Sequence, residues 1–355
     1  MTPFAFVIHP LTVRDMGRKY PVVKILPEGL VEWVLKSRKP EIVSEITGIK
    51  GITGAETQGW FIGCPLTPKL INELPTEVVY ERIVQCTEIA HSLGAKLIGL
   101  GAFTSVVGDG GITIAERSKI PVTTGNSYTV ATAMEGTLKA CGMLGIDPDT
   151  ATLAVVGASG SIGRTCALGL SPRFRKTLLL GRDQNKLQAV EDECVRAEVA
   201  SLEDLTEADA IVAVSSASGA LIDPKHLKTG SVVCDVARPR DVSVKVEKER
   251  PDVLVIEGGV VAVPGEVDFH FNFGFPPKTA YACMSETMLL ALEGRAESFT
   301  LGKTVSLQQV ETMQELAEKH GFTLSGFRSF EKTVSDERIR QVQLARKEKS
   351  TVKTP

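Results

Sequence analysis

The feature that most constrains this chain is a glycine-rich turn that follows a short apolar run. Residues 152–156 read Thr-Leu-Ala-Val-Val, Gly157 comes directly after them, and Gly160 and Gly163 follow at steps of three. The first glycine permits a tight turn from strand to helix, and the second lets backbone N–H groups approach a pyrophosphate. The third allows the helix to pack closely on the strand. The spacing therefore predicts a site for a dinucleotide.

The surroundings of this turn matter, because a glycine cluster alone can be an ordinary structural turn. Short apolar runs alternate here with segments long enough for crossover helices, as in a parallel sheet covered on both faces. We expect strands at 152–156, 177–180, 210–214, 231–234 and 253–256. This rhythm predicts an α/β fold with a Rossmann-like domain. The expected cofactor loop consists of Gly157, Ala158, Ser159, Gly160, Ser161, Ile162 and Gly163.

The end of the second strand indicates which dinucleotide binds. An acidic residue there accepts the ribose 2′-hydroxyl of NAD(H), whereas the 2′-phosphate of NADP(H) needs a cation. The chain has Arg182 at this position, and Lys186 follows one helical turn later. Asp183 keeps NAD(H) as the alternative, since a shift of one residue places its carboxylate at the ribose. We predict NADPH, held by Arg182 with help from Lys186.

The rest of the chain shows a second α/β pattern before this domain and helices after it. The elements expected there are strands at 4–8, 60–64 and 96–100 and helices at 78–93, 128–144, 279–293 and 305–320. We predict an N-terminal α/β substrate domain 1–127, a linking helix 128–148, a Rossmann NADP-binding domain 149–275, C-terminal helices 276–330 and a charged tail 331–355. The tail is expected to be a solvated helix that frays.

Composition excludes several classes of function. The chain has 40 basic and 43 acidic residues, so its net charge of −3 gives no general field for nucleic acid or anionic membranes. No apolar run approaches the ~18 residues that span a bilayer, and the N-terminus lacks the pattern of a secretory signal, so we expect a cytoplasmic protein. The seven cysteines form no Cys-x-x-Cys pair, which argues against a disulfide framework and a metal site.

Four stretches resemble a known family. They are Gly-Leu-Gly-Ala-Phe-Thr-Ser at 99–105, Thr-Thr-Gly-Asn at 123–126, the loop 157–163 and Ala-Cys-Met-Ser-Glu at 282–286. Their order and spacing resemble those of the long-chain acyl-[acyl-carrier-protein] reductases of cyanobacteria, which reduce fatty acyl thioesters to aldehydes. The likeness covers nearly the whole chain.

The resemblance implies that Cys283 is a nucleophile. Its thiolate would attack the acyl thioester, and hydride from NADPH would then reduce the acyl-cysteine to the aldehyde. A cysteine suits this chemistry because its acyl adduct accepts hydride readily and its anion is a good leaving group. The resemblance further gives Glu286 an orienting or protonating role, although a carboxylate in a first helical turn can equally stabilise the helix dipole. The residues that would line the thioester site are Thr104, Ser105, Thr124, Gly125 and Asn126.

The sequence departs from this family at Tyr128, where the family has a histidine, so a role for an imidazole there is lost or passes to the phenol. Two alternatives stay open. One is an NADP-dependent alcohol dehydrogenase of the shikimate or quinate kind, and the other is a non-catalytic nucleotide- or carrier-binding protein. The resemblance implies an acyl carrier protein or coenzyme A as the acyl donor, and the sequence does not distinguish them because both carry the same phosphopantetheine arm. A candidate docking surface for the acidic carrier is formed by Arg14, Arg18, Lys19, Lys36, Arg38 and Lys39.

Overall fold

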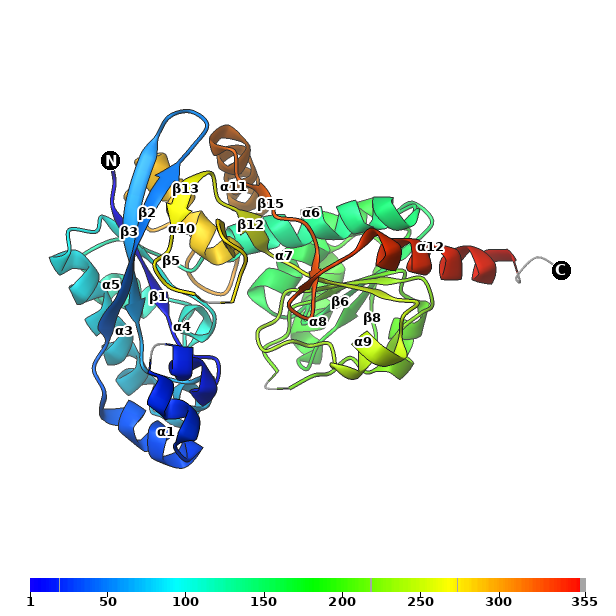
Figure 1. Cartoon of the computed structure of the whole chain (residues 1–355). Helices are drawn as coiled ribbons and strands as arrows, with labels where there is room; N and C mark the ends of the chain where they lie inside the picture. The colour runs from blue at the N-terminus through cyan, green and yellow to red at the C-terminus, as the bar shows by residue number, and fades with distance from the viewer. Residues whose placement is uncertain (19, 218, 273, 352–355) are drawn as a thin grey trace. The chain divides into compact units, whose positions relative to one another are not determined.

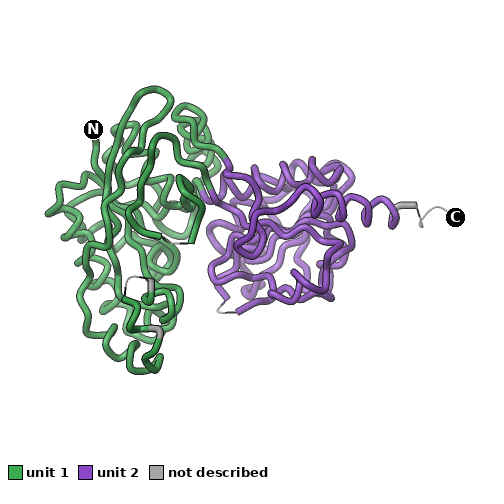
Figure 2. The backbone as a smooth tube through the Cα atoms, in the orientation of Figure 1, with its two compact units in different colours: residues 1–128, 261–323 green, residues 129–260, 324–355 purple. Residues whose placement is uncertain are grey.

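The computed structural model describes residues 1–18, 20–217, 219–272 and 274–351, and the chain forms two compact units (Figure 2). Unit 1 comprises residues 1–128 and 261–323. Unit 2 comprises residues 129–260 and the segment from residue 324 onward. Each unit is therefore assembled from segments that are far apart in the sequence.

Unit 1 is built on a six-stranded mixed sheet in the order β13-β2-β3-β1-β4-β5 (Figure 1). Its strands are β1 (Phe4–Ile8), β2 (Glu41–Lys50), β3 (Glu56–Gly63), β4 (Leu97–Gly99), β5 (Val122–Thr123) and β13 (Gly265–Asp268). β3, β1, β4 and β5 are parallel, whereas β2 is antiparallel to both of its neighbours. The segments that follow the parallel strands consequently start from the same edge of the sheet.

Different helices cover the two faces of this sheet. Ala5 and Val7 of β1 share a core with α3 (Thr76–Ser92), and the opposite face packs against α10 (Ala282–Leu292). A Cβ atom at Gly99 would lie 2.1 Å from the hydroxyl oxygen of Thr287, so α10 is seated on the sheet at a glycine. The remaining helices are η1 (Val13–Arg18), η2 (Pro21–Ile25), α1 (Glu28–Ser37), α2 (Pro68–Glu73), α4 (Phe103–Val106), α5 (Ile112–Arg117) and α11 (Leu307–His320).

Unit 2 contains a six-stranded parallel sheet in the order β11-β10-β9-β6-β7-β8. Its strands are β6 (Thr152–Val156), β7 (Lys176–Leu180), β8 (Ala197–Val199), β9 (Ala210–Ala213), β10 (Val232–Asp235) and β11 (Leu254–Glu257). Counted from β6, the spatial order is that of the Rossmann fold, in which ligands bind where the strand order reverses. The predicted α/β fold is confirmed, and this reversal lies between β6 and β9.

The helices of unit 2 connect and flank these strands (Figure 1). They are α6 (Asn126–Leu144), which begins in the last residues of unit 1, α7 (Ser161–Leu170), η3 (Ser171–Arg173), α8 (Gln184–Glu193), η4 (Glu203–Glu207), η5 (Pro224–His226), α9 (Lys245–Glu249) and α12 (Asp336–Thr351). The strands outside the two large sheets, which belong partly to unit 1 and partly to unit 2, are β12 (Val260–Ala262), β14 (Thr279–Tyr281), β15 (Thr323–Leu324), β16 (Arg328–Ser329) and β17 (Lys332–Thr333). None of the described helices combines the length and apolar character that crossing a bilayer requires.

Three expectations about the C-terminal third need correction. The Rossmann unit ends at residue 260 rather than 275, because β13 joins the sheet of unit 1 beside β2. The helix expected at 279–293 begins at Ala282, since the three residues before it form β14. The charged tail is not simply solvated: Val342 of α12 is fully buried, and Arg346 donates to the carboxylate of Asp209 at 3.0 Å. Residues 352–355 of the predicted tail lie outside the described residues.

Candidate active site

The glycine loop follows β6, and its geometry explains why two of its glycines are needed. Gly157 has a φ of 91°, and a Cβ atom there would come within 2.9 Å of the backbone of Ser215. A Cβ atom at Gly163 would lie 2.2 Å from the carbonyl oxygen of Gly157. Gly160 is exposed, and a Cβ atom there would lie 3.3 Å from the same carbonyl oxygen, a contact tighter than usual. The loop and the start of α7 thus fit a pyrophosphate.

The cofactor-selecting residues lie at the end of β7. Arg182 is exposed, and its guanidinium makes a long contact of 3.5 Å with the hydroxyl of Ser216, which follows β9. Asp183 caps α8 instead, because its carboxylate accepts the backbone N–H of Lys186 at 3.1 Å. The Lys186 ammonium group lies 3.4 Å from the same carboxylate. Asp183, the residue that supported the NAD(H) alternative, is therefore engaged in capping α8. The guanidinium of Arg182 instead lies near Ser216.

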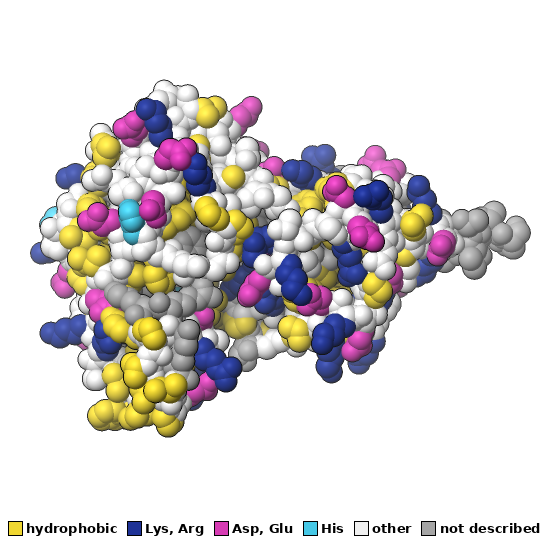
Figure 3. Space-filling model, in the orientation of Figure 1, with side chains coloured by type: hydrophobic (Ala, Val, Ile, Leu, Met, Phe, Trp, Pro, Cys, Tyr) yellow, Lys and Arg dark blue, Asp and Glu magenta, His cyan; other side chains and the backbone are white. Residues whose placement is uncertain are grey.

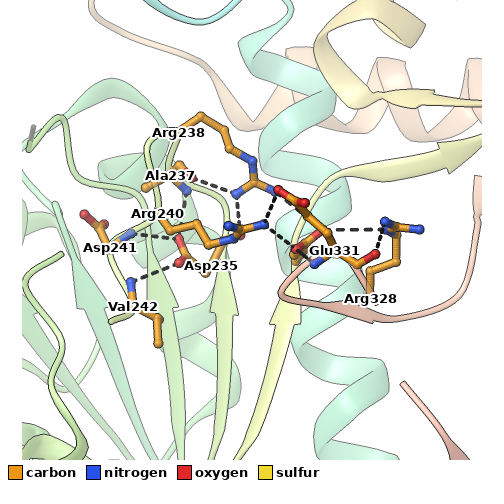
Figure 4. Close-up of polar contacts among 9 residues, drawn as sticks. Asp235, Ala237, Arg238, Arg240, Asp241, Val242, Arg328 and Glu331 are labelled. Carbon is orange, nitrogen blue, oxygen red and sulfur yellow. Dashed lines mark hydrogen bonds and ion pairs between the residues drawn. The ribbon is translucent and has the colours of Figure 1, made fainter. Parts of the chain in front are cut away.

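A charged cluster follows β10 and β11, and no predicted site residue belongs to it (Figure 4). Glu257, at the end of β11, is paired with Arg240 at 2.9 Å and with Arg328 at 3.7 Å. Its carboxylate also accepts the backbone N–H of Glu331, which ties the C-terminal segment to the sheet. The signal in the sequence was the group of charged residues at 238–241, a few residues after the predicted strand 231–234, at the edge where Rossmann ligands bind.

The buried carboxylate of Asp235 organises the loop after β10 in the same cluster (Figure 4). It accepts the backbone N–H groups of Ala237 and Val242 at 3.2 and 3.0 Å. Burial raises the pKa of Asp235 from 3.8 to about 6, although the nearby Arg238 pulls this pKa down. Asp235 is therefore protonated in the folded chain at a pH where it ionises in the unfolded chain.

This shift predicts how stability depends on pH. The protonated form of Asp235 favours the fold, so its contribution is complete below the unfolded pKa of 3.8 and is lost as the pH rises through about 6. Relative to Asp235→Asn, the free energy of unfolding should fall by about 2 to 3 kcal/mol across this window. Denaturant unfolding of both proteins at pH values from about 4 to about 7 measures this difference, because the folded and unfolded pKa values of Asp235 lie ~2 units apart in that range. Parallel pH profiles would show that Asp235 ionises normally in the fold.

Cys283 has an unusual position on α10. Ten of the eleven residues of this helix are buried, and Cys283, the second residue, is the one that remains half-buried. A core helix thus presents a single thiol at its N-terminal end. The partial positive charge of a helix N-terminus favours an anion there.

The other six cysteines lie in less suitable surroundings. Burial raises the pKa of Cys141 and of Cys234 to about 12, and it also raises the pKa of Cys86 and of Cys166. Cys194 is half-buried but lies at the C-cap of α8, where the helix dipole disfavours a thiolate, and burial raises its pKa. Cys64 directly follows β3 and is fully buried beneath α3.

Gly125 lies directly against Cys283. A Cβ atom on Gly125 would come within 2.4 Å of both the Cα and the Cβ atoms of Cys283, and Gly125 has a φ of 75°. Because Gly125 immediately precedes α6, the first turns of α6 and α10 meet at the thiol-bearing residue. The structure therefore brings together two of the predicted site residues, and it does so through a close approach that only glycine permits.

Glu286 lies one turn further along α10 and is fully buried. Its carboxylate accepts the hydroxyls of Thr123 and Thr300 at 2.5 and 2.9 Å and the backbone N–H of Tyr128 at 2.9 Å. Tyr128 is the third residue of α6, so Glu286 caps that helix from α10. Burial raises the pKa of Glu286, and the hydrogen bonds from Thr123 and Tyr128 partly offset this rise. These contacts join the starts of α6 and α10.

The remaining predicted substrate residues are buried and largely engaged locally. The hydroxyls of Thr104 and Ser105 donate to the carbonyls of Gly101 and Ala102 within the turn that begins α4. Thr124 donates to the carbonyl of Thr300 at 3.1 Å, and Asn126 begins α6 beside Gly125. These residues follow β4 and β5, which pair with each other. They therefore lie at the same edge of the sheet as Gly125, the residue that contacts Cys283.

His9 is a further polar residue at this edge, and its role was not predicted. It follows β1, and its Nε2 atom accepts the backbone N–H of Phe103 at 3.1 Å, while Nδ1 faces the carbonyl of Pro10. Burial lowers the pKa of His9 to about 4, so the imidazole is neutral near pH 7. A histidine that ends a buried parallel strand was the signal in the sequence.

Comparisons with known proteins agree with this division of the chain. Residues 143–257 match the shikimate / quinate 5-dehydrogenase family, and this stretch lies within unit 2. Among solved structures, the L-tryptophan dehydrogenase of Nostoc punctiforme is 12% identical, with 99% of this chain and 89% of that chain covered and a TM-score of 0.40. The chain is also 31% identical to the aminotransferase PigE of Serratia sp. over 95% of its own length, but it spans only 41% of that relative.

A second curated relative is matched over most of its length. The long-chain acyl-[acyl-carrier-protein] reductase of Synechococcus elongatus is 30% identical over 87% of this chain and 94% of the relative. Together with the Rossmann topology of unit 2, these matches identify an oxidoreductase with a site for a nicotinamide cofactor. By the extent of this match, the chain belongs to the long-chain acyl-[acyl-carrier-protein] reductase family.

Proposed function

We propose that this chain reduces a fatty acyl thioester to a fatty aldehyde, with Cys283 as the acyl acceptor and NADPH as the cofactor. The observation that carries the proposal is the placement of Cys283. It is the single half-buried residue of a buried helix, it lies at the helix start, and Gly125 fixes its backbone from the other side. A direct hydride transfer from an alcohol to NADP⁺ needs no such thiol.

Cys283 acts first in the proposed reaction. Its thiolate attacks the carbonyl carbon of the acyl thioester, the bond from that carbon to the carrier sulfur breaks, and the carrier leaves as a thiol after taking up a proton. The acyl group is then held on Cys283 as a new thioester. Cys283 lies at the start of α10, and the partial positive charge of that helix start favours the negative charge that develops on the carbonyl oxygen.

The nicotinamide cofactor supplies the hydride when it is bound, and the residues that would hold it are the glycine loop 157–163 and Arg182. Cys283 keeps the acyl carbon in place until that carbon has accepted the hydride. The sulfur then leaves as a thiolate, the carbonyl reforms, and the aldehyde is released. Glu286 takes no direct part in this proposal, because its carboxylate is fully buried and caps α6. It is a positioning residue that holds α6 and α10 in register.

The identity of the acyl donor is supported by the comparisons. The reductase of Synechococcus elongatus is named for acyl carrier protein, so we infer the same donor here, with acyl-CoA as the second candidate. The match to an aminotransferase is consistent with an aldehyde product, because aminotransferases transfer an amino group to a carbonyl compound. The shikimate-type match is confined to the cofactor-binding unit and gives no support to an alcohol substrate.

A substrate screen tests the proposed function. Purified protein is mixed with NADPH and with acyl-carrier and acyl-CoA thioesters of graded chain length, and both NADPH oxidation and aldehyde are measured. Aldehyde should form in proportion to the NADPH consumed, with the carrier-bound donor preferred. Oxidation of shikimate or quinate with NADP⁺, without any reaction of thioesters, would contradict the proposal.

The preference for NADPH should depend on Arg182. Its guanidinium would make a charge-assisted contact with the 2′-phosphate worth about 1.5 to 3 kcal/mol. Arg182→Ala should therefore raise the KM for NADPH by roughly tenfold to a hundredfold and leave the KM for NADH nearly unchanged. Lys186→Ala is the matched control and should have a smaller effect, because the Lys186 ammonium already pairs with Asp183. Equal losses with both cofactors would show that the 2′-phosphate is held elsewhere.

A further inference from the structure

The region before β2 carries an apolar surface that no described part of the chain covers. Six large apolar side chains are exposed within the thirteen residues 22–34, which run from η2 through the connection after it into α1: Val22, Ile25, Leu26, Leu30, Trp33 and Val34. We name these six residues the 22–34 surface. Ile25 is 82% exposed and Trp33 is 70% exposed. In Figure 3 hydrophobic side chains gather at the end of unit 1 where Figure 1 places α1.

The pattern on α1 shows that this exposure is more than scattered apolar residues. Val31 and Leu35 are buried and attach the helix to the core of unit 1. Leu30, Trp33 and Val34 are spaced by three and four residues, so they form a second apolar stripe that faces solvent. Contiguous apolar surface of this kind is uncommon on soluble proteins and marks a binding surface.

The charge of this region differs from that of the whole chain. Residues 13–39 contain seven basic and three acidic residues, whereas the full chain carries a net charge of −3. Arg14, Lys36 and Lys39 are exposed beside the apolar residues. Lys19 lies outside the described residues. A basic segment with a large exposed apolar stripe is complementary to an anionic lipid surface.

An acidic carrier protein fits this surface less well. Its recognition would rely on cations, and two of these are already paired: Arg38 donates to Glu41 at 2.9 Å, and Arg14 lies 3.8 Å from Glu28. The exposed side chains of the 22–34 surface are apolar. One of them is Trp33, and tryptophan favours the membrane interface. The apolar character of the surface therefore favours a lipid bilayer over an acidic carrier protein as its partner.

We propose that η2 and α1 dock on the surface of an anionic lipid bilayer, with the 22–34 surface inserted among the acyl chains and the flanking Lys and Arg residues at the headgroups. The chain would lie on the bilayer without spanning it. This binding does not depend on the chemistry of Cys283, and its test can fail while the proposed reaction holds. It would place the protein beside the phase in which a long-chain aldehyde dissolves.

Vesicle binding by the full-length protein tests the proposal. Vesicles of phosphatidylcholine with phosphatidylglycerol are compared with vesicles of phosphatidylcholine alone, and bound protein is measured by flotation. The chain has two tryptophans, so Trp60→Phe leaves Trp33 as the single fluorescent reporter. We expect binding to the anionic vesicles, with a blue shift of Trp33 emission and quenching by lipids brominated in their acyl chains.

A matched pair of variants locates the contact. Ile25→Ser should weaken binding to the anionic vesicles by about tenfold or more, because it removes a side chain that would be buried in lipid. Ile52→Ser removes the same side chain from the β2–β3 turn, where Ile52 is 74% exposed, and should leave binding unchanged. Circular dichroism and thermal unfolding should show both variants folded.

Several results would overturn the proposal. Binding to neither type of vesicle, or equal weakening by Ile25→Ser and Ile52→Ser, would exclude lipid docking through this surface. Loss of a concentration-dependent dimer in Ile25→Ser, without vesicle binding by the parent protein, would assign the surface to a second copy of the chain. Loss of binding to an acidic carrier protein, again without vesicle binding, would assign it to the carrier.

Discussion

Replacing Cys283 by serine is expected to lower aldehyde formation by at least about a thousandfold while NADPH still binds. A hydroxyl near neutral pH is a far weaker nucleophile without a partner base, and the ester that it forms accepts hydride less readily than a thioester. The fold should survive, because the change replaces one atom, although a buried hydroxyl without a partner costs about 1 to 3 kcal/mol. Steady-state aldehyde formation and NADPH titration measure the two properties separately.

Cys194→Ser is the matched control for this variant. Cys194 is also half-buried, but it lies at the end of α8 rather than at the start of a helix. Its replacement should leave aldehyde formation within about twofold of the parent protein, as expected for a surface substitution of ±0.5 kcal/mol. Folded Cys283→Ser protein that made aldehyde at the parent rate would instead point to direct hydride transfer to the bound thioester.

Gly125→Ala is expected to lower activity by at least about a hundredfold, because it displaces the residue that carries the thiol. The new methyl group would come within 2.4 Å of the Cα and Cβ atoms of Cys283, so one of the two helix starts must move. The backbone at Gly125 also has a φ of 75°, which costs alanine about 1 to 2 kcal/mol. Aldehyde formation and the free energy of unfolding should both fall, and activity should fall more than the folded fraction.

Gly94→Ala separates the two effects of that substitution. Gly94 has a φ of 85°, and a Cβ atom there would meet nothing within 4 Å. The Gly94→Ala protein should therefore lose about 1 to 2 kcal/mol of stability and keep the activity of the parent protein. If Gly125→Ala behaved like Gly94→Ala and remained fully active, the close approach of α6 and α10 would be unimportant for the reaction.

Much of unit 2 could be predicted from the sequence because its parallel strands are short, apolar and separated by regular helical segments. β6 has the bounds expected for it, β7 and β9 differ from the expected bounds by one residue at one end, and β10 and β11 are each shifted by one residue. β8 was not expected, because only three residues form it and none of them is fully buried. A strand at the edge of a sheet lacks the apolar run that covered strands show.

Unit 1 was harder to predict because its assembly depends on distant pairings. β2 pairs with β3 through two register shifts, which break the alternation of apolar and polar residues that identifies a strand. β13 joins the same sheet from more than two hundred residues away, and no local pattern reports such a pairing. The predicted domain boundary at 275 was wrong for this reason.

The candidate site shows the same limit. Cys283 was expected as the nucleophile, yet neither its half-buried state nor its contact with Gly125 follows from local sequence. The role of Glu286 also depends on tertiary structure: its capping partners Tyr128 and Thr300 come from two other segments. Glu286 lies beyond the first turn of α10, and its carboxylate caps a different helix, α6.

The most direct test of the central claim is the mass of the protein after it is mixed with acyl thioester in the absence of NADPH. The account predicts a covalent increase equal to the acyl group, located on the peptide that contains Cys283, and its discharge as aldehyde when NADPH is added. Cys283→Ser protein should show no such increase. An unmodified parent protein that still forms aldehyde once NADPH is present, or an adduct on another cysteine, would contradict the account.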